Sequence, residues 1–308
     1  FSADSGIGQL AQAVNAGDGA AVRGIWAQDH PDLALAAIPN FEAPALGSLV
    51  IGGGLAATAA PLADSLHTVT ATSPADPLHT STAAPPADKD QKPTGEQPPA
   101  RLGYGHYLTL LRQGRPGPEA APGAFDDWAR RVLKAHGQFQ VLCALRRGPW
   151  GVEGLNHVIA GALQEAQLID AGTGWYLGRP VLVTRNDYGL GLMNGDIGVT
   201  LVHPGAAGQG AGLRVAFPAG DGQDGIKWVL PSRLQAVETV YALTVHKSQG
   251  SEFTHVALVL PEHPSPILTR ELLYTGITRA RHHFTLVRPG GEAVLDRAVR
   301  RQVLRASG

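Results

Sequence analysis

Methionine, cysteine and long apolar runs are all scarce in this sequence. The only methionine is Met193, so we do not expect Phe1 to be a translation start, and we expect the sequence to be part of a longer chain. The only cysteine, Cys143, lies in an apolar run, which favours a buried thiol in a reducing compartment. No apolar run approaches the roughly 20 residues of a membrane helix, and residues 1–4 lack the features of a signal peptide. We therefore expect a cytoplasmic protein that does not cross a membrane.

Positive charge and the residues of a phosphate-binding loop are also missing. The chain has 25 Lys and Arg against 26 Asp and Glu, which argues against a broad basic surface for nucleic acid. A P-loop needs Gly-Lys followed by Ser or Thr, but none of the five lysines follows a glycine. No apolar strand ends in paired Asp-Glu for Mg²⁺, and no other metal site is apparent. We expect this chain alone to hydrolyse no ATP, because it lacks the phosphate cradle and the magnesium carboxylates.

A polar segment between two apolar runs organises the rest of the chain. The runs Leu234–Leu243 and His255–Leu260 both read as buried strands. The segment between them carries five functional side chains, Thr244, His246, Lys247, Gln249 and Glu252. In α/β proteins such loops at strand ends carry the chemistry. The alternative is an exposed turn made only for solvent.

The segment Leu272–Arg281 forms a second candidate site. It is predicted to begin as a helix and to lead into an apolar strand over His283–Arg288. Arg279 and Arg281 fall near the helix end. One interpretation is that their positive charges only balance the helix dipole. The alternative is that a guanidinium binds a phosphate in a neighbouring cleft.

Both segments resemble motifs of superfamily 1 helicases. T-V-H-K-S-Q-G-S-E-F (244–253) resembles motif V, and L-Y-T-G-I-T-R-A-R (273–281) resembles motif VI. The spelling is closest to the RecD-type branch, the alpha subunit of exodeoxyribonuclease V. The resemblance implies that Thr244 and His246 contact single-stranded DNA. It also implies a nucleotide-binding role for Gly250 and for Glu252, which would accept hydrogen bonds from the ribose.

The same resemblance assigns the arginines. Arg279 would be the catalytic arginine that contacts the γ-phosphate, and Arg281 is a weaker candidate for that role. C-A-L-R-R-G-P-W-G-V-E-G-L-N (143–156) resembles motif IV, in which Arg146 or Arg147 would face the nucleotide. The alternative for these two is a solvated surface pair. The stretch that contains N-D-Y and N-G-D-I-G resembles a stretch found in RecD-like helicases. This resemblance adds Asn186 as a candidate DNA-binding residue.

The predicted fold class is α/β, with a RecA-like parallel sheet and flanking helices, as in the second motor domain of a P-loop helicase. Its ligand edge should be the carboxyl ends of the strands. Short alternating strands predict a small inserted β-barrel, which the family has as an SH3-like subdomain 2B. The predicted domains are 2A over residues 1–60, 104–187 and 239–308, and the insertion 2B over 188–238. Residues 61–103, rich in Pro and Ala, are predicted to be a disordered insertion.

The resemblance predicts the C-terminal part of an ATP-dependent DNA helicase for recombination and repair. It also implies that translocation runs in the 5′→3′ direction. ATP and Mg²⁺ would serve the full-length protein, with none bound to this part alone. The expected partners are DNA, the two other subunits of exodeoxyribonuclease V and a P-loop motor domain of the same chain. The alternatives are a stand-alone RecD-like helicase, a nucleotide-binding regulator that does not translocate, and a module that only holds partner proteins.

Overall fold

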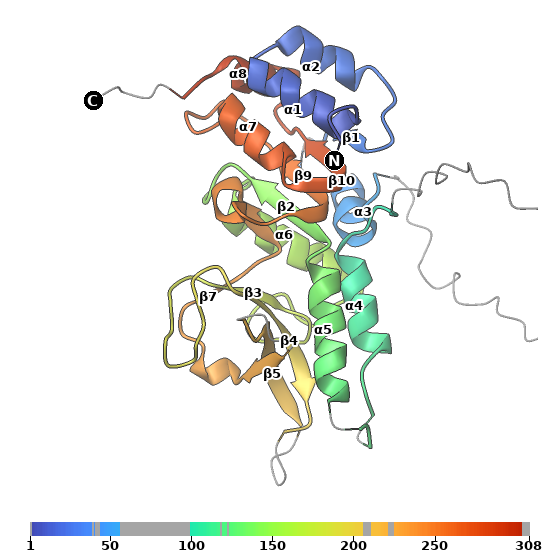
Figure 1. Ribbon diagram of the computed structural model, residues 1–308, viewed down its shortest axis with the longest axis vertical. Helices are drawn as coiled ribbons and strands as arrows, with labels where there is room; N and C mark the ends of the chain where they lie inside the picture. Colours follow the sequence, from blue (N-terminus) through green and yellow to red (C-terminus); the bar gives the residue numbers. More distant parts are fainter. Residues whose placement is uncertain are drawn as a thin grey trace, which may run out of the picture.

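The computed structural model describes residues 2–38, 40, 44–55, 99–117, 119–121, 123–205, 211–220 and 225–303. Most of the predicted Pro/Ala-rich insertion therefore lies outside the described residues. No helix in these ranges is long and apolar enough to cross a membrane. Two sheets, sheet A and sheet B, divide the molecule into the upper and lower parts of Figure 1.

Sheet A is the parallel sheet that the sequence predicts. Its strand order is β1 (Leu33–Ala36), β10 (Ala280–Val287), β9 (Phe253–Val259), β2 (Phe139–Cys143) and β8 (Ala242–Thr244). Every neighbouring pair runs parallel. All five residues of β2 are buried, as expected for a strand in a sheet covered on both faces. The parallel sheet with flanking helices is confirmed.

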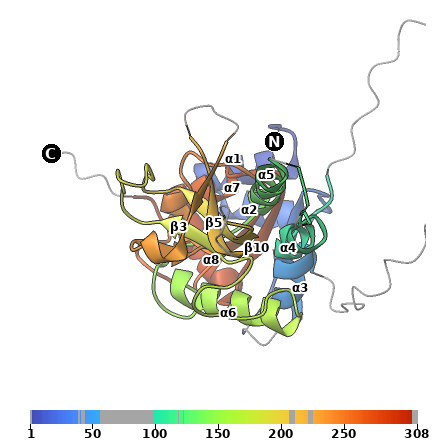
Figure 2. The same ribbon diagram turned by 90° about the horizontal axis from the view of Figure 1, so that it is seen from below.

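Helices cover both faces of sheet A. One face packs against α3 (Pro44–Gly52), α4 (Tyr104–Gln113), α5 (Ala124–His136) and α6 (Val152–Glu165). The other packs against α1 (Gly6–Ala16), α2 (Gly19–Trp26), α7 (Arg270–Ile277) and α8 (Gly291–Arg300). Figure 1 shows α1, α2 and α7 above the strands of sheet A and α6 below them, and Figure 2 shows the same elements from below. The two faces therefore have separate cores.

Local sequence explains where the first helix begins and ends. The Ser5 hydroxyl accepts a hydrogen bond from the Gly8 N–H and caps α1. Gly17 ends the helix in the left-handed conformation, with φ of 74°, which favours glycine. Cys143 is buried, as predicted, and burial raises the pKa of its thiol to about 12.

Sheet B is antiparallel, with the order β6 (Ile226–Val229), β5 (Gly212–Pro218), β4 (Ile197–His203), β3 (Pro180–Val183) and β7 (Val237–Thr239). The strands predicted for the insertion appear in it. The strand β3 also belongs here, although the predicted boundary at residue 187 places it in the α/β domain. Val, Leu and Pro in a short buried run suit either kind of sheet, so composition alone could not assign β3.

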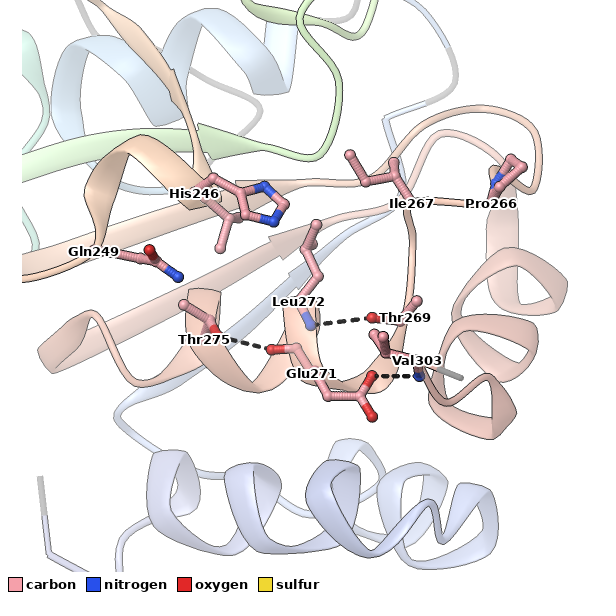
Figure 3. A pocket seen from close by; sticks show the side chains of 10 residues that line it. His246, Gln249, Pro266, Ile267, Thr269, Glu271, Leu272, Thr275 and Val303 are labelled. Carbon is pink, nitrogen blue, oxygen red and sulfur yellow. Dashed lines mark hydrogen bonds between the residues drawn. The ribbon is translucent and has the colours of Figure 1, made fainter. Parts of the chain in front are cut away.

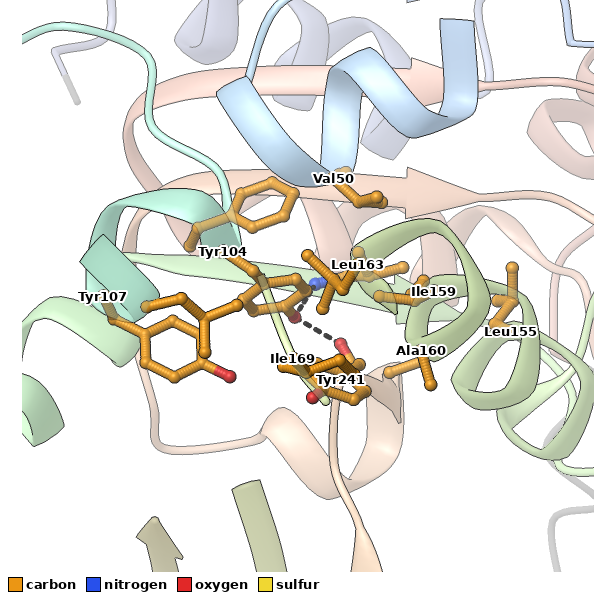
Figure 4. Close-up of a cluster of buried hydrophobic side chains, with 14 of the residues drawn as sticks. Val50, Tyr104, Tyr107, Leu155, Ile159, Ala160, Leu163, Ile169 and Tyr241 are labelled. Carbon is orange, nitrogen blue, oxygen red and sulfur yellow. Dashed lines mark hydrogen bonds between the residues drawn. The ribbon is translucent and has the colours of Figure 1, made fainter. Parts of the chain in front are cut away.

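The predicted strand Leu234–Leu243 is wrong as one unit, because the chain leaves sheet B after Thr239 and enters sheet A at Ala242. Polar contacts hold this crossing. The Asn156 Oδ1 on α6 accepts hydrogen bonds from the Tyr241 N–H at 2.8 Å and the Ala242 N–H at 3.0 Å. The Tyr104 hydroxyl donates to the Tyr241 carbonyl. Figure 4 shows Tyr241 and Tyr104 in the buried cluster beside α6, so the crossing is packed on the core.

Candidate functional site

The predicted site residues lie at both ends of the parallel strands. Thr244 ends β8 and His246 follows it, and Arg146 and Arg147 follow β2, so these four lie at the carboxyl edge of sheet A. Gly250, Glu252, Arg279 and Arg281 precede or begin β9 and β10, so they lie at the amino edge. The candidate residues therefore do not all gather at the carboxyl ends of the strands, where the sequence predicted the ligand edge. The reason is that the loop after β8 passes from one edge of the sheet to the other before β9 begins.

At the amino edge, pairing between β9 and β10 brings Glu252 and Arg281 together. Phe253 and Ala280 are register partners, and the Phe253 N–H donates to the Arg279 carbonyl at 2.9 Å. The Arg281 Nε donates to Glu252 Oε2 at 2.8 Å. This hydrogen bond lowers the pKa of the Glu252 carboxyl. Both side chains are largely exposed, at 62% for Arg281 and 50% for Glu252, so they are open to a ligand.

The Arg279 guanidinium is half-buried beside this pair and is fixed by neutral oxygens. Its Nε donates to the Thr275 carbonyl at 3.2 Å, and its Nη1 donates to the Ser251 carbonyl at 3.0 Å. Its Nη2 lies 3.4 Å from Thr278 Oγ1. It forms no ion pair with a carboxylate in the part of the chain that the structure describes, although its charge helps to lower the pKa of the nearby Glu252 carboxyl, after Arg281. Arg279 therefore carries an oriented positive charge at this edge.

Gly250 makes the turn that leads into β9. Its φ is 85°, in the left-handed region that residues with a Cβ rarely adopt. A Cβ there would meet no atom within 4 Å, so the requirement for glycine comes from the backbone conformation and not from crowding. The turn delivers Ser251 and Glu252 to the arginines. A cavity of about 520 Å³ adjoins Arg281; its lining is Ser2, Asp4, Ser5, Gly6, His30, Pro31, Asp32, Arg281 and His282.

At the carboxyl edge, a short 3₁₀ helix over Val245–Ser248 presents His246. The Thr244 hydroxyl caps it by accepting a hydrogen bond from the Lys247 N–H at 3.3 Å. Thr244 is therefore already engaged in local structure, whereas the His246 and Lys247 side chains are exposed. Neither of those two side chains has a hydrogen bond or an ion pair within the described ranges.

His246 borders a cavity of about 290 Å³ between the 3₁₀ helix and α7, shown in Figure 3. The lining is Val245, His246, Gln249, Pro266, Ile267, Thr269, Glu271, Leu272, Thr275 and Val303. The Glu271 carboxylate on its wall accepts a hydrogen bond from the Val303 N–H at 3.2 Å. Sequence reasoning missed Glu271 and Thr275. Their i, i+4 spacing at the start of the motif VI helix could have shown that they share one helix face.

Arg146 and Arg147 do not join the other predicted nucleotide residues. Seven residues of β9 separate the two edges by about 20 Å, at roughly 3.3 Å per residue. Arg146 and Arg279 therefore follow and precede the strands at opposite edges of sheet A. The Arg146 Nη2 instead donates to Glu238 Oε1 on β7 at 2.6 Å, and this hydrogen bond raises the pKa of Arg146. Arg147 is exposed.

Asn186 lies on sheet B, in the loop after β3. Its Oδ1 accepts a hydrogen bond from the Asn194 N–H at 2.8 Å, and its Nδ2 donates to the Tyr188 hydroxyl at 3.2 Å. Both ends of its amide are therefore used within the loop.

No group of three or more His, Cys, Asp or Glu side chains within the described residues could hold a metal ion.

Comparison with known proteins finds a family match over most of the candidate residues at these two edges. The UvrD-like helicase C-terminal domain matches residues 239–287. The RecBCD enzyme subunit RecD of Mycobacterium tuberculosis is 43% identical over 190 residues, which is 62% of this chain and 31% of the relative. The same subunit of Haemophilus influenzae is 37% identical over 203 residues, 65% of this chain and 29% of the relative.

A relative of another kind is the ATP-dependent RecD2 DNA helicase of Deinococcus radiodurans, 36% identical over 173 residues, 52% of this chain and 22% of the relative. Among solved structures, the Pif1 helicase from Bacteroides in complex with ADP-AlF3 and single-stranded DNA aligns with 15% identity and a TM-score of 0.31. That alignment covers 58% of this chain and 44% of the other. The chain spans about a third of the length of the curated relatives that it matches. The chain is thus similar to RecD subunits over 62–65% of its length, and residues 239–287 are similar to the UvrD-like helicase C-terminal domain.

Proposed function

We propose that this chain is the C-terminal part of an ATP-dependent DNA helicase that unwinds DNA, in the 5′→3′ direction, for recombination and double-strand-break repair. The observation that carries the proposal is the Arg279 guanidinium, which is held beside the exposed Glu252–Arg281 pair at the amino edge. The relatives named as RecD subunits and as an ATP-dependent helicase support it.

In this proposal the nucleotide lies at the amino edge. The exposed Glu252 carboxylate suits ribose hydroxyls, which donate hydrogen bonds, and Arg279 and Arg281 suit phosphate oxygens. The bound ATP supplies the phosphoryl group, and a P-loop domain would supply the Mg²⁺ site that these residues do not form. Arg279 would stabilise the negative charge that spreads over the phosphoryl oxygens in the transition state.

Arg279 would act across a domain interface. Its Nη1 donates a hydrogen bond to the Ser251 carbonyl at 3.0 Å, and its Nε donates one to the Thr275 carbonyl. Those neutral acceptors orient the guanidinium without cancelling its charge. When the two motor domains close on ATP, a phosphate oxygen can replace the Ser251 carbonyl as a stronger, charged acceptor.

The DNA lies at the carboxyl edge in this proposal. His246 is exposed there and can stack on a base or contact a phosphate, while Lys247 beside it supplies charge. Thr244 would contribute mainly by setting the 3₁₀ turn that presents His246, because its hydroxyl already accepts the Lys247 N–H. The separation of about 20 Å between the edges allows both ligands to be bound at once.

Sheet B would be the inserted subdomain 2B, with an SH3-like barrel fold. Its five-stranded antiparallel pairing and its place between the motif IV and motif V segments support this assignment.

The expected partners are the two other subunits of exodeoxyribonuclease V, because several of the most similar relatives are named as RecBCD subunits.

Strand displacement by the intact protein that contains this chain tests the proposal. We expect separation of a duplex with a 5′ single-stranded tail only when ATP and Mg²⁺ are both present, and ATPase activity that rises when single-stranded DNA is added. A protein that hydrolyses ATP at the same rate with and without DNA, and separates no duplex, would overturn the proposal.

A further inference from the structure

The cavity of about 290 Å³ beside His246 has apolar side chains that are open to solvent. Ile267 and Val303, which line it, are 43% and 49% exposed, although most large apolar side chains of the core are buried. His246 borders the same cavity, so this apolar surface continues from the candidate DNA contact. Exposed apolar surface around a hollow is typical of a place where a ligand binds. The cavity is therefore a candidate site for one part of the same ligand.

The other polar groups of the cavity are negative or neutral. Glu271 supplies a carboxylate, and Gln249, Thr269 and Thr275 supply an amide and two hydroxyls. No lysine or arginine is among the described residues that line it. A phosphate would be repelled by the carboxylate and would meet no guanidinium or ammonium group. An uncharged group that donates hydrogen bonds therefore suits the cavity better than a phosphate.

The Glu271 carboxylate is ionised at neutral pH and can accept further hydrogen bonds. Burial by itself would raise the pKa of Glu271, but hydrogen bonds from its own N–H, from Thr269 and from Val303 lower it on balance. The side chain is 40% exposed, and its Oε1 lies 3.6 Å from Arg270 Nε, beyond a direct hydrogen bond. Its Oε2 accepts from the Val303 N–H at 3.2 Å. A carboxylate has about four acceptor positions, so both oxygens remain available to a ligand.

The size and shape of the cavity suit a single base. Pockets for drug-sized ligands hold roughly 300–1,000 Å³, and this cavity lies just below that range. Figure 3 shows His246 and Ile267 above Leu272, and Thr275, Glu271 and Val303 below it. The His246 ring and the apolar side chains offer surface to the flat face of a base. A base that enters here can then present its polar edge to Glu271.

We propose that this cavity receives one base of single-stranded DNA and that the Glu271 carboxylate gives it a preference for guanine. The inference rests on the proposed DNA-binding function and adds a base selectivity to it. Guanine has two adjacent donors on one edge, N1–H and the N2 amino group, which match the two oxygens of a carboxylate. Unpaired thymine, cytosine and adenine each have one donor group on that edge, beside an acceptor that a carboxylate repels. Glu271 is therefore a specificity-determining residue.

A basic side chain of a partner protein is the other group that a carboxylate could bind. The surface next to the cavity disfavours it, because Lys247 follows His246 and is exposed. A cationic partner would be repelled by this ammonium group, whereas the phosphates of a DNA strand would be attracted to it while one base enters the cavity. The charges around the cavity thus favour DNA.

Binding of fluorescent single strands to the intact protein, at one fixed salt concentration, tests the inference. The strands are oligo(dT) in which one central thymine is kept or replaced by guanine, hypoxanthine or adenine. We expect the guanine strand to bind about tenfold more tightly than oligo(dT), at the lower end for a bidentate contact. Hypoxanthine keeps N1–H but lacks the amino group, so it should lose most of this gain, and adenine should lose all of it. This series needs no variant of the protein.

A pair of variants assigns the preference to one carboxylate. In Glu271→Gln the ratio of the dissociation constants for oligo(dT) and the guanine strand should fall to about one, since an amide cannot accept both donors. Glu292→Gln neutralises an exposed carboxylate on α8 and is the matched control, so it should keep the parental ratio.

Equal binding of the guanine and thymine strands by the parent would overturn this inference and leave the proposed function standing. A guanine preference that survives in Glu271→Gln would also overturn it, because another group would then select the base. Loss of a partner subunit from Glu271→Gln, with no guanine preference in the parent, would identify the cavity as a site for a basic side chain and overturn it too. Failure of the parent to bind any single strand would overturn both the inference and the proposed function.

Discussion

The two edges of sheet A differ in how their charged groups are held. At the amino edge, Arg281 is paired with Glu252, and Arg279 donates to two backbone carbonyls. At the carboxyl edge, His246 and Lys247 extend into solvent with no such partner within the described ranges. The first arrangement fixes direction before a ligand arrives, and the second leaves the side chains free to adapt.

This difference fits the demands of the two proposed ligands. Phosphoryl transfer requires a guanidinium at one place relative to the reacting oxygens, so prior orientation reduces the cost of reaching the transition state. A translocating strand presents a succession of bases and phosphates, and adaptable contacts suit it better. Three of the four predictions that follow test whether the edges divide the work in this way, and the other tests a buried histidine that supports the amino edge.

The largest expected effect follows from Arg279→Lys. Lysine keeps the charge but loses the planar fork that rests on two carbonyls, so kcat for ATP hydrolysis should fall by about 10³-fold or more, the scale of arginine fingers. Binding of ATP and DNA should persist. Arg281→Lys is the matched control and should cost far less, since Arg281 lies on the exposed rim. A large loss of kcat in Arg281→Lys, with near-parental kcat in Arg279→Lys, would show that Arg281 and not Arg279 is the catalytic arginine.

The next effect concerns the support beneath the amino edge. His255 is buried in β9, where its ring nitrogens lie 3.1 Å from the Leu102 carbonyl and 2.9 Å from Thr285 Oγ1. Burial lowers the pKa of His255 to about 4. The unfolded chain binds the proton first, so stability is complete above pH 6.5 and declines as the pH falls from 6.5 towards 4. The contribution lost by pH 5 should be about 2 kcal/mol.

Urea unfolding at pH 7.5 and pH 5 measures this loss. His255→Gln retains polar atoms in the site but does not titrate, so the difference between the two pH values should shrink by about 2 kcal/mol in the variant. His136 is also buried with its pKa lowered to about 4, and His136→Gln tests its separate share. An unchanged pH dependence in His255→Gln would show that the ring is protonated or solvated in the folded protein.

A smaller effect is expected at the carboxyl edge. His246→Ala should weaken binding of single-stranded DNA by about tenfold, the loss of one stacked or hydrogen-bonded contact. It should lower DNA-stimulated ATPase activity and spare the affinity for ATP. Anisotropy titrations at fixed salt provide the measurement. Equal DNA affinity in variant and parent would remove His246 from the DNA path.

The smallest effect should come from Glu252→Ala. Loss of a ribose contact should raise the KM for ATP several-fold and leave kcat nearly unchanged, because the contact is present in the ground state and the transition state alike. The ion pair with Arg281 is exposed, and such pairs contribute little to stability, so the melting temperature should hardly move. A clear drop in melting temperature with a normal KM would give Glu252 a structural role.

Much of the fold follows from local sequence, and the arrangement of the site does not. Cap residues such as Ser5 and Gly17 act within one turn of helix, so they could be predicted. The break after Thr239 could not, because Asn156 and Tyr104, distant in sequence, hold the crossing at Tyr241. The division of the polar segment 244–252 between two edges depends on strand pairing, which periodicity does not encode.

The central claim is that the nucleotide binds at the amino edge and DNA at the carboxyl edge, and a crossed titration tests it most directly. Dissociation constants for an ATP analogue and for single-stranded DNA would be measured separately in the parent, in Glu252→Ala and in His246→Ala. We predict that Glu252→Ala loses affinity only for the nucleotide and that His246→Ala loses affinity only for DNA. Loss of the same ligand in both variants, or loss of the opposite ligand in each, would contradict the account.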